Sequence, residues 1–250
     1  MKLETTISGP EDAPALLIVP GLFGSARNWG VIQKRLSDRF RVTAVDMRNH
    51  GASGWSDDHS YKALAGDLAD TLEGPSHVLG HSMGGKASMV LALTRPELVD
   101  RLIVADIAPV AYDHTQAHLV EAMKSFDLDK ISTRSEADAL LAEKIDTKGV
   151  RAFLLQSLDV QNKCWNLNLD VLAREMPKIV GWPDISGSFP KPALFLSGAD
   201  SDYVTPGSRP QIRALFSKAR FASIPDAGHW LHAEKPREVE ATIRAFLVRA

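Results

Sequence analysis

The sequence is poor in cysteine, in long apolar runs and in charge of one sign. Cys164 is the only cysteine among 250 residues, which excludes disulfides within the chain and structural zinc sites built from several thiolates. No apolar run approaches the roughly 20 residues of a membrane-spanning helix. Because 29 Lys and Arg residues nearly balance 31 Asp and Glu residues, the net charge of -2 gives no electrostatic reason to expect nucleic acid or an anionic membrane as a partner.

The chain also starts without the apolar core of a signal peptide, because it begins Met1-Lys2-Leu3-Glu4-Thr5. We therefore expect a cytoplasmic protein without a membrane span. A hydrophobic content of 44% over this length is enough for one large core, and α/β proteins of this size often form a single domain.

Short apolar runs alternate with helix-like segments, which predicts an α/β protein. Continuous apolar runs are typical of strands buried on both faces of a parallel sheet. We expect such strands at residues 15–19, 40–45, 101–105, 193–196 and 221–224. Residues 2–8 alternate between polar and apolar and fit an edge strand. The prediction is a mostly parallel sheet with helices on both faces, in which functional residues follow the carboxyl ends of the strands.

The pattern changes between residues 111 and 188. Helix-like segments lie at residues 118–126, 135–145, 149–158 and 169–179, with no convincing strand among them. We interpret this all-helical insertion between two strands as a cap, or lid, that covers the active edge of the sheet and excludes water. The expected division is an α/β core domain of residues 1–110 and 189–250, with a helical cap of residues 111–188.

The first catalytic motif is Gly80-His81-Ser82-Met83-Gly84, which follows an apolar run and precedes a helix-like segment that ends before Pro96. This strand, turn and helix pattern is typical of a nucleophile elbow, in which small residues two before and two after the serine let strand and helix pack closely. Ser82 is therefore the candidate nucleophile. The same stretch nearly spells a phosphate-binding loop, but Ala87 stands where a Ser or Thr hydroxyl would hold magnesium.

Two further residues complete a possible triad. Asp106 directly follows the apolar run of residues 101–105, and His229 follows the last predicted strand in a glycine-containing loop. They fall after Ser82 in the order Ser, Asp, His that this type of sheet uses. We expect Ser82 as nucleophile, His229 as general base and Asp106 as the acid that orients the imidazole. The alternative for Asp106 is a capping or turn aspartate.

A glycine-rich loop, Pro20-Gly21-Leu22-Phe23-Gly24-Ser25, follows the first buried strand. Such a loop before a helix can aim backbone N–H groups at a negatively charged atom. In an esterase, the backbone N–H groups of Leu22 and of Met83, the residue after the nucleophile, would form the oxyanion hole. The alternative is that the side chains of Leu22 and Phe23 only cover the core.

Two other polar groups have simpler interpretations. Asp46 with Arg48 and His50 can suggest a catalytic cluster, but we favour a turn held by charge-assisted hydrogen bonds. His114 and His118 lie four residues apart and can share a helical face as metal ligands. No third ligand is evident, so we expect no metal site.

Five ordered blocks of the sequence resemble the α/β-hydrolase superfamily over essentially the whole chain and, within it, the bacterial YbfF-type esterases. The blocks are Gly21-Leu22-Phe23-Gly24-Ser25, Asp46-Met47-Arg48-Asn49-His50-Gly51, Gly80-His81-Ser82-Met83-Gly84-Gly85-Lys86, Asp106-Ile107-Ala108-Pro109-Val110 and Gly228-His229-Trp230-Leu231-His232-Ala233-Glu234-Lys235-Pro236. The resemblance implies a cofactor-free serine esterase with a small helical cap. It would act on short- or medium-chain acyl esters or thioesters as small-molecule substrates, through a Ser-His-Asp triad and an acyl-enzyme intermediate.

The resemblance leaves the acid with two candidates and includes one departure. The commonest superfamily position follows the strand after the cap, where Asp202 has the familiar spacing to Pro206. Asp106 matches the alternative position before the cap, which YbfF-type esterases use by resemblance, and we favour it with Asp202 as the alternative acid. Pro20 stands where the superfamily usually has a histidine that supports the oxyanion loop.

Other functions remain open at this point. The same triad can serve an acyl-CoA thioesterase, or a cofactor-free perhydrolase or carbon–carbon hydrolase. A non-catalytic binding protein on a hydrolase scaffold is a further alternative, and the intact set of Ser82, Asp106 and His229 argues against it.

Overall fold

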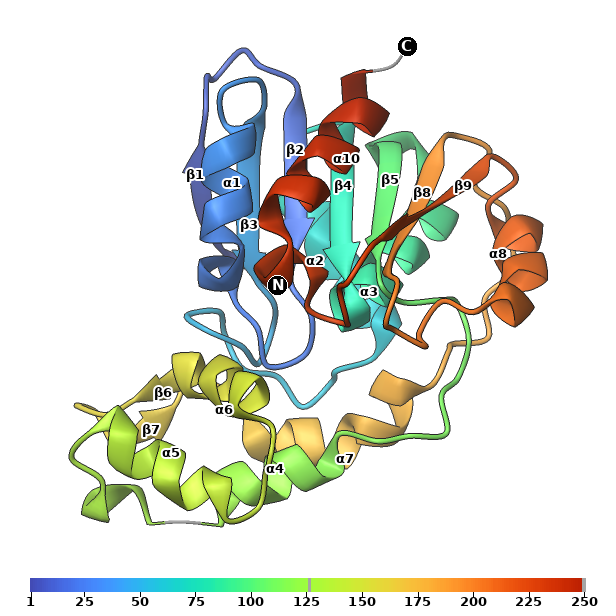
Figure 1. Cartoon of the computed structure of the whole chain (residues 1–250). Coiled ribbons are helices and arrows are strands. Elements are labelled where there is room, and N and C mark those ends of the chain that lie inside the picture. Colours follow the sequence, from blue (N-terminus) through green and yellow to red (C-terminus); the bar gives the residue numbers. More distant parts are fainter. Residues whose placement is uncertain (126, 249–250) are drawn as a thin grey trace.

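The computed structural model describes residues 1–125 and 127–248 and contains a seven-stranded sheet in the order β1-β3-β2-β4-β5-β8-β9 (Figure 1). β1 pairs antiparallel with β3, and the other neighbours pair in parallel. The strands are β1 (Glu4–Ser8), β2 (Ala15–Val19), β3 (Arg41–Asp46), β4 (Ser76–His81), β5 (Val99–Ala105), β8 (Ala193–Gly198) and β9 (Ala219–Ile224). This is the α/β-hydrolase fold that the sequence predicts, and the apolar runs form its central strands.

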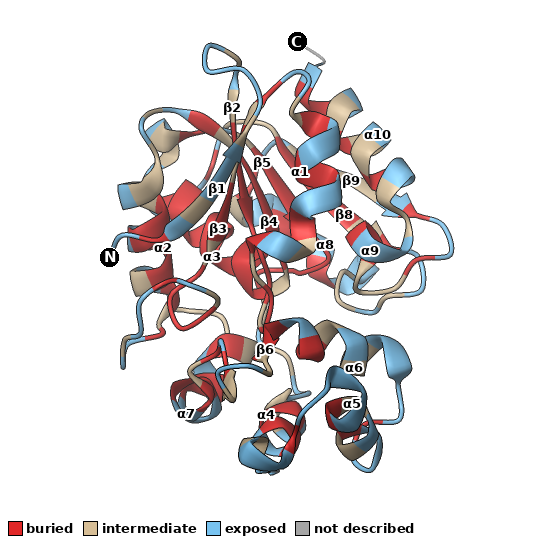
Figure 2. Cartoon of the chain, turned by 90° about the vertical axis from the view of Figure 1, so that its left-hand side faces the viewer, coloured by how far each residue is buried: buried red, intermediate tan, exposed pale blue. Residues whose placement is uncertain are grey.

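The sheet lies between two layers of helices. The helices α1 (Gly30–Leu36), α9 (Leu231–Glu234) and α10 (Pro236–Val248) cover one face, and α2 (Tyr61–Thr71), α3 (Ser82–Thr94) and α8 (Arg209–Leu215) cover the other. Successive residues of a strand point to opposite faces, so each apolar run supplies both layers. In β2, Leu16 and Ile18 join the core under α1 and α10, while Leu17 and Val19 join the core under α2 and α3. Figure 2 shows these central strands buried on both sides.

The segment between β5 and β8 lies beyond the carboxyl ends of the strands (Figure 1). It contains α4 (Ala117–Lys124), α5 (Arg134–Ala142), α6 (Lys148–Leu154), α7 (Leu169–Val180), β6 (Leu158–Asp159) and β7 (Cys164–Trp165). Short 3-10 turns complete the fold at η1 (Ala26–Trp29), η2 (Pro96–Leu98), η3 (Leu128–Lys130), η4 (Leu155–Ser157) and η5 (Pro206–Ser208). The predicted helix of residues 118–126 ends at Lys124, and residue 126 lies outside the described residues. The division into core and cap stays a prediction.

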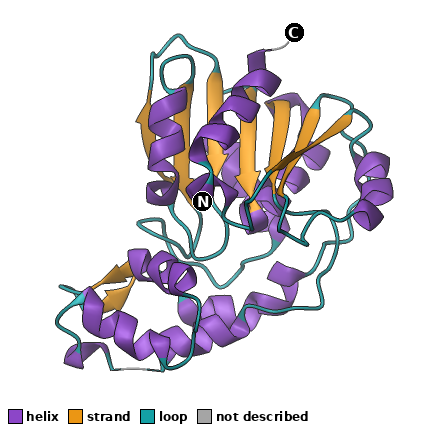
Figure 3. Ribbon diagram, in the orientation of Figure 1, coloured by secondary structure: helices purple, strands orange, loops and turns teal. Residues whose placement is uncertain are grey.

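One expectation for this segment is wrong, because it is not entirely helical. β6 and β7 form a two-stranded antiparallel hairpin, drawn in orange among the helices of Figure 3. The side chain of Asp159 accepts hydrogen bonds from the N–H groups of Gln161 and Asn162, and Lys163 has a left-handed φ of 54°. An aspartate that bonds its own following backbone favours a turn, and that local bonding replaces continuation of the helix.

Helix length is relevant to membrane association. The longest described helices, α3 and α10, have 13 residues each. None of the helices within residues 1–125 and 127–248 combines the length and the apolar character that a bilayer crossing requires. The cytoplasmic location stays a prediction.

The turn between β4 and α3 is packed so closely that its glycines cannot be replaced without movement of the backbone. A Cβ at Gly84 would lie 2.2 Å from the Pro20 carbonyl oxygen and 2.5 Å from that of Val19. A Cβ at Gly80 would lie 2.5 Å from the Gly84 carbonyl oxygen. These contacts bring the carboxyl end of β2 against the first turn of α3, as the elbow pattern predicts.

We predict that Gly84→Ala lowers the free energy of unfolding by about 3 kcal/mol. The new methyl group would collide with backbone oxygens, which cannot move aside by a change of rotamer as a side chain can. Gly66→Ala, on the exposed side of α2 with no atom within 4 Å, is the matched control and should stabilise the fold by about 1 kcal/mol. Urea denaturation of both variants measures the difference. An unchanged midpoint for Gly84→Ala would show that the close approach is not required.

Candidate active site

Ser82 lies in the sharp turn between β4 and α3, at the carboxyl edge of the sheet. Its φ of 52° is in the left-handed region, which is rare for a serine and is held here by the packing of the glycines on either side. The chain at Gly21 approaches it closely, because a Cβ on that glycine would lie 3.0 Å from the Ser82 Cβ. The hydroxyl oxygen lies 3.0 Å from Nε2 of His229, which comes from the loop after β9.

The opposite side of the His229 ring faces Asp106. Nδ1 of His229 lies 2.8 Å from Oδ2 of Asp106, which is fully buried at the end of β5. A carboxylate accepts hydrogen bonds, so Nδ1 carries the proton and Nε2 is left to accept from the Ser82 hydroxyl. The three side chains come from three different strand ends, 123 and 147 residues apart along the chain, and the structure brings them together.

Asp106 also has partners that the sequence reasoning missed. The Gly198 N–H donates to Oδ1 at 3.1 Å, and the Ser201 hydroxyl donates to Oδ2. Together with His229, these donors give the fully buried Asp106 carboxylate three hydrogen-bond partners. Ser201 lies in the loop after β8, directly before Asp202 in the sequence. Asp202, the alternative acid, is exposed in that same loop, so the structure places Asp106 and not Asp202 against the ring. The catalytic roles of these residues stay predictions.

The His229 ring is held on its faces and through its backbone. Tyr203 stacks on it with a centroid distance of 4.1 Å and an interplanar angle of 23°. The Tyr112 hydroxyl donates to the Tyr203 carbonyl at 2.7 Å and accepts from the Ala108 N–H at 2.9 Å. Nε2 of His81 lies 2.8 Å from the His229 carbonyl oxygen, to which it donates. Residues close in sequence to Asp106 and Ser82 therefore fix the position of His229.

A layer of aromatic rings lies behind His229. Trp29 stacks on His232 at 4.1 Å, and His81 lies edge-on to His232 at 4.8 Å. Burial lowers the pKa of His232 to about 3 and that of His81 well below its ordinary value. Nδ1 of His232 has no hydrogen-bond partner within the described part of the chain. The His81 and His232 rings are therefore neutral at physiological pH and add no positive charge next to His229.

The proposed oxyanion loop forms a tight turn whose Gly24 N–H donates to the Gly21 carbonyl at 3.0 Å. Phe23 has a φ of 64°, the sign that a type II turn needs at its third residue. Its N–H donates to Nε2 of His50 at 3.1 Å, while Nδ1 of His50 donates to the Arg48 carbonyl at 2.9 Å. The imidazole of His50 thus bonds the backbone of this loop, although the chain has Pro20 where the superfamily usually has a histidine. The roles of the Leu22 and Met83 amides stay predictions.

The Asp46 block is the structural turn that the sequence favours. Asp46 accepts from the N–H of Ala26 through Oδ1 and from that of Ala52 through Oδ2, both at 2.8 Å. Arg48 forms a buried ion pair with Asp67, at 2.6 and 2.8 Å. These bonds hold the block that carries His50 beside the oxyanion loop.

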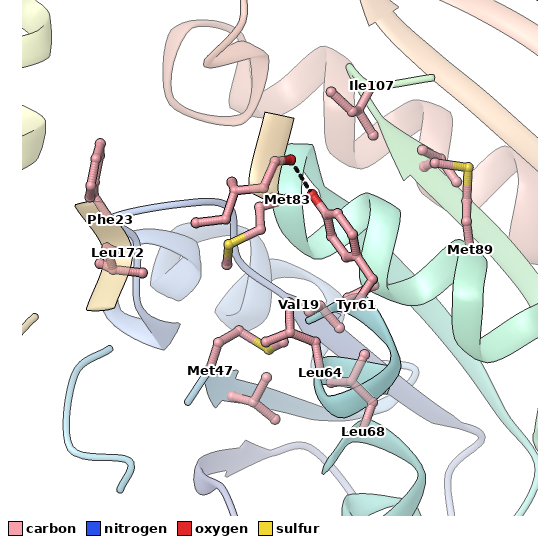
Figure 4. Close-up of a cluster of buried hydrophobic side chains, with 14 of the residues drawn as sticks. Val19, Phe23, Met47, Tyr61, Leu64, Leu68, Met83, Met89, Ile107 and Leu172 are labelled. Atoms are coloured by element: carbon pink, nitrogen blue, oxygen red, sulfur yellow. Dashed lines mark hydrogen bonds between the residues drawn. The ribbon is translucent and has the colours of Figure 1, made fainter. Parts of the chain in front are cut away.

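A cavity of about 230 Å³ opens between Ser82 and residues of the segment between β5 and β8, residues 106–192, which we call the capping segment. Its walls are mostly apolar, and they include Leu22, Met83, Ile107, Leu119, Phe153 and Ile179. Figure 4 shows Met83 and Tyr61 above Leu64 and Leu68 in the buried cluster, with a dashed line at the Tyr61 hydroxyl. This hydroxyl donates to the Ile179 carbonyl at 2.6 Å.

Lys86, one helical turn after Ser82, is the charged group on the wall of this cavity. Its ammonium donates to the carbonyls of Val180 and Gly181, at 2.8 and 2.5 Å, and lies 4.7 Å from the centre of the Tyr112 ring. Burial lowers the pKa of Lys86 to about 7. The sequence motif included this lysine but gave no indication of its partners. By binding carbonyls at the carboxyl end of α7, Lys86 joins the capping segment to α3.

No metal centre is evident within residues 1–125 and 127–248, where no three His, Cys, Asp or Glu side chains gather as ligands. His114, one of the two histidines considered as ligands, packs against the rings of Tyr112 and Tyr203 at 5.3 and 5.0 Å. Independence from metals and cofactors stays a prediction.

Comparison with known proteins gives consistent results. A family model described as "Alpha/beta hydrolase family" matches residues 16–242. The chain is 40% identical to the sn-1-specific diacylglycerol lipase ABHD11 of Mus musculus, over 96% of this chain and 83% of that protein. It is also 40% identical to esterase YbfF of Escherichia coli (strain K12), over 93% of this chain and 92% of that protein. Among solved structures, a marine microorganism esterase superposes with a TM-score of 0.93 at 37% identity, covering 98% of this chain and 99% of the other.

We predict that His232→Phe reduces the acid sensitivity of the fold. With a pKa of about 3 when folded and about 6.5 when unfolded, His232 binds a proton in the unfolded chain first, so stability falls as the pH drops through this window. The substitution should remove about 1.4 kcal/mol per pH unit from the slope of unfolding free energy between pH 6 and 4.

Urea denaturation at a series of pH values measures the slope. His118→Phe, at an exposed position, controls for the loss of a histidine as such. If the two variants have the same slope as the wild type, the buried ring does not contribute to acid unfolding.

Proposed function

The chain belongs to the alpha/beta hydrolase family and is a hydrolase, and from this premise we propose that it is a serine carboxylesterase for short- to medium-chain acyl esters. The observation that carries the proposal is the continuous pair of hydrogen bonds from Ser82 Oγ through the His229 ring to Asp106. A serine is a weak nucleophile by itself, and a base oriented by a buried carboxylate is the usual means of activating it.

In the acylation step, the Ser82 hydroxyl attacks the ester carbonyl while Nε2 of His229 takes its proton. The proton already on Nδ1 stays hydrogen-bonded to Asp106, whose negative charge stabilises the imidazolium. The imidazolium then protonates the alkoxide that leaves, which completes the acyl-enzyme. The rings of His81 and His232 are neutral, so neither places a positive charge next to the imidazolium that forms on His229.

The carbonyl oxygen becomes negatively charged during this attack. The N–H groups of Leu22 and Met83 are the proposed donors to it, one from the turn after β2 and the other from the first turn of α3. Water then attacks the acyl-enzyme with His229 as base, and Ser82 is regenerated. Apart from substrate and water, each step uses only side chains and amides of this chain, so we propose that no cofactor takes part.

The proposed substrate class rests on the cavity. Its modest volume of about 230 Å³ and mostly apolar walls suit an acyl chain of short or medium length. The names of the relatives, an esterase and a diacylglycerol lipase, belong to proteins that act on esters. We therefore place p-nitrophenyl esters, a diacylglycerol and an acyl-CoA in one substrate panel, so that a thioesterase would be recognised by its preference.

We predict that Ser82→Ala lowers kcat/KM for the preferred p-nitrophenyl ester by at least about 10³-fold, because no other hydroxyl replaces the nucleophile. Asp106→Asn should cost about 10³–10⁴-fold by supplying the wrong hydrogen-bonding partner to the ring. Asp202→Asn, the matched control on the exposed loop, should stay within about twofold of wild type.

Hydrolysis is measured across acyl chain lengths, with circular dichroism to establish that each variant is folded. Loss of activity in Asp202→Asn with retention in Asp106→Asn would transfer the acid to Asp202. Full turnover by Ser82→Ala would overturn the proposed function.

A further inference from the structure

The turn that supplies the Leu22 amide has an unfavourable conformation that its own sequence does not explain. Phe23 has a φ of 64°, where an L-residue loses about 1–2 kcal/mol relative to its preferred regions and where glycine is the usual choice. Its side chain is buried, with 3% of its surface exposed. A strained turn persists only where its surroundings hold it in place. The contacts of Phe23 are therefore the place to look for what sets the position of the Leu22 amide.

Each peptide plane of this turn has an external or internal hydrogen bond. The plane that contains the Leu22 N–H is fixed through its Gly21 carbonyl, which accepts from the Gly24 N–H at 3.0 Å. The next plane is fixed by the Phe23 N–H, which donates to His50 Nε2 at 3.1 Å. The third is fixed by the Phe23 carbonyl, which accepts from the Ser157 hydroxyl at 3.0 Å. A flip of either plane that flanks Phe23 would break one of these bonds.

Ser157 comes from the capping segment, 134 residues away from Phe23 in the chain. It ends the 3-10 turn η4, and its own carbonyl accepts from the Asn166 N–H at 2.8 Å. The Asn166 carbonyl in turn accepts from the Gly51 N–H at 2.8 Å, next to His50. The bonds thus form a closed ring that runs from the oxyanion turn through the His50 loop and the capping segment back to Phe23.

We propose that His50 and Ser157 are positioning residues that hold the oxyanion turn from two sides, so that the capping segment helps to place the Leu22 amide. The inference rests on the proposed esterase function. Neither side chain touches the reacting atoms; both act through the backbone of Phe23. His50 suits this task because its Nδ1 proton is committed to the Arg48 carbonyl, which leaves Nε2 as an acceptor. Burial lowers the pKa of His50 to about 4, so the acceptor stays unprotonated at neutral pH.

The test uses Ser157→Ala in the full chain, with Ser157→Thr as the variant that retains the hydroxyl. We expect kcat for the preferred p-nitrophenyl ester to fall about tenfold in Ser157→Ala, the rate equivalent of about 1.4 kcal/mol, with KM within about twofold. A trifluoromethyl ketone of matched chain length forms an oxyanion on Ser82, so its affinity should fall by the same factor as kcat. Ser157→Thr should restore most of both.

Arg174→Ala is the matched control, because Arg174 also joins the capping segment to the core, at the carbonyl and carboxylate of Asp57, without touching the oxyanion turn. It should leave kcat and ketone affinity unchanged. If Ser157→Ala instead keeps the wild-type kcat, or if Arg174→Ala loses as much activity, the proposal is overturned.

Two further comparisons keep the test decisive. Should Ser157→Ala be too unstable to assay, judged by its melting temperature, Ser157→Cys keeps the volume and weakens the donor, and the same split between kcat and KM is expected from it. Ser82→Ala is assayed in parallel. An active Ser82→Ala refutes the esterase function itself, whereas an inactive Ser82→Ala beside a fully active Ser157→Ala overturns the positioning proposal and leaves the esterase function standing.

Discussion

The site depends on one steric constraint, which is the close approach of the first turn of α3 to the carboxyl end of β2. At Gly84 there is no room for a Cβ between the helix and the carbonyls of Val19 and Pro20. That contact fixes the left-handed backbone of Ser82 and brings Gly21 against the serine side chain. Ser82 and the proposed oxyanion turn are therefore placed by the same packing interaction, and His229 and Asp106 are positioned relative to it by their hydrogen bonds.

The electrostatics of the site follow from burial more than from charge. The imidazoles behind and beside it are kept neutral by desolvation, with a pKa of about 4 for His50 and about 3 for His59 and His232. A neutral imidazole offers one donor and one acceptor, so it can hold a backbone group without adding a charge, as His50 and His81 do here. His81 donates to the loop of His229 and His50 accepts from the oxyanion turn. The negative charge of Asp106 therefore faces His229 and neutral donors.

The sequence predicted what depends on local pattern. Apolar runs identified the central strands, and glycine spacing identified the elbow, because strand burial and the close approach of backbones restrict residue type at fixed intervals. The hairpin β6–β7 was missed, since it depends on a single aspartate bonding its own backbone inside a segment of helical composition. Asp106 and Asp202 each follow a strand end, so the sequence ranked them only by resemblance, whereas their distances to the His229 ring depend on how three loops fold together. Ser201 and Ser157 gave no signal, because an isolated serine is common in loops and its partner lies far along the chain.

At Pro20 the turn after β2 lacks the histidine that the superfamily usually has at this position, and other residues bond the turn instead. The superfamily histidine that usually supports the oxyanion loop would come from the strand end itself, next to the turn. Here the acceptor for Phe23 comes instead from His50, held by the Asp46 turn, and the donor to its carbonyl comes from beyond β5. Proline has no N–H and a fixed φ, so at position 20 it restricts the backbone that leads into the turn, and its side chain has no group with which to form a hydrogen bond. Two side chains outside β2 therefore bond the turn, and one of them, Ser157, belongs to the capping segment. The capping segment of this chain thus contacts the proposed oxyanion turn as well as forming a wall of the cavity.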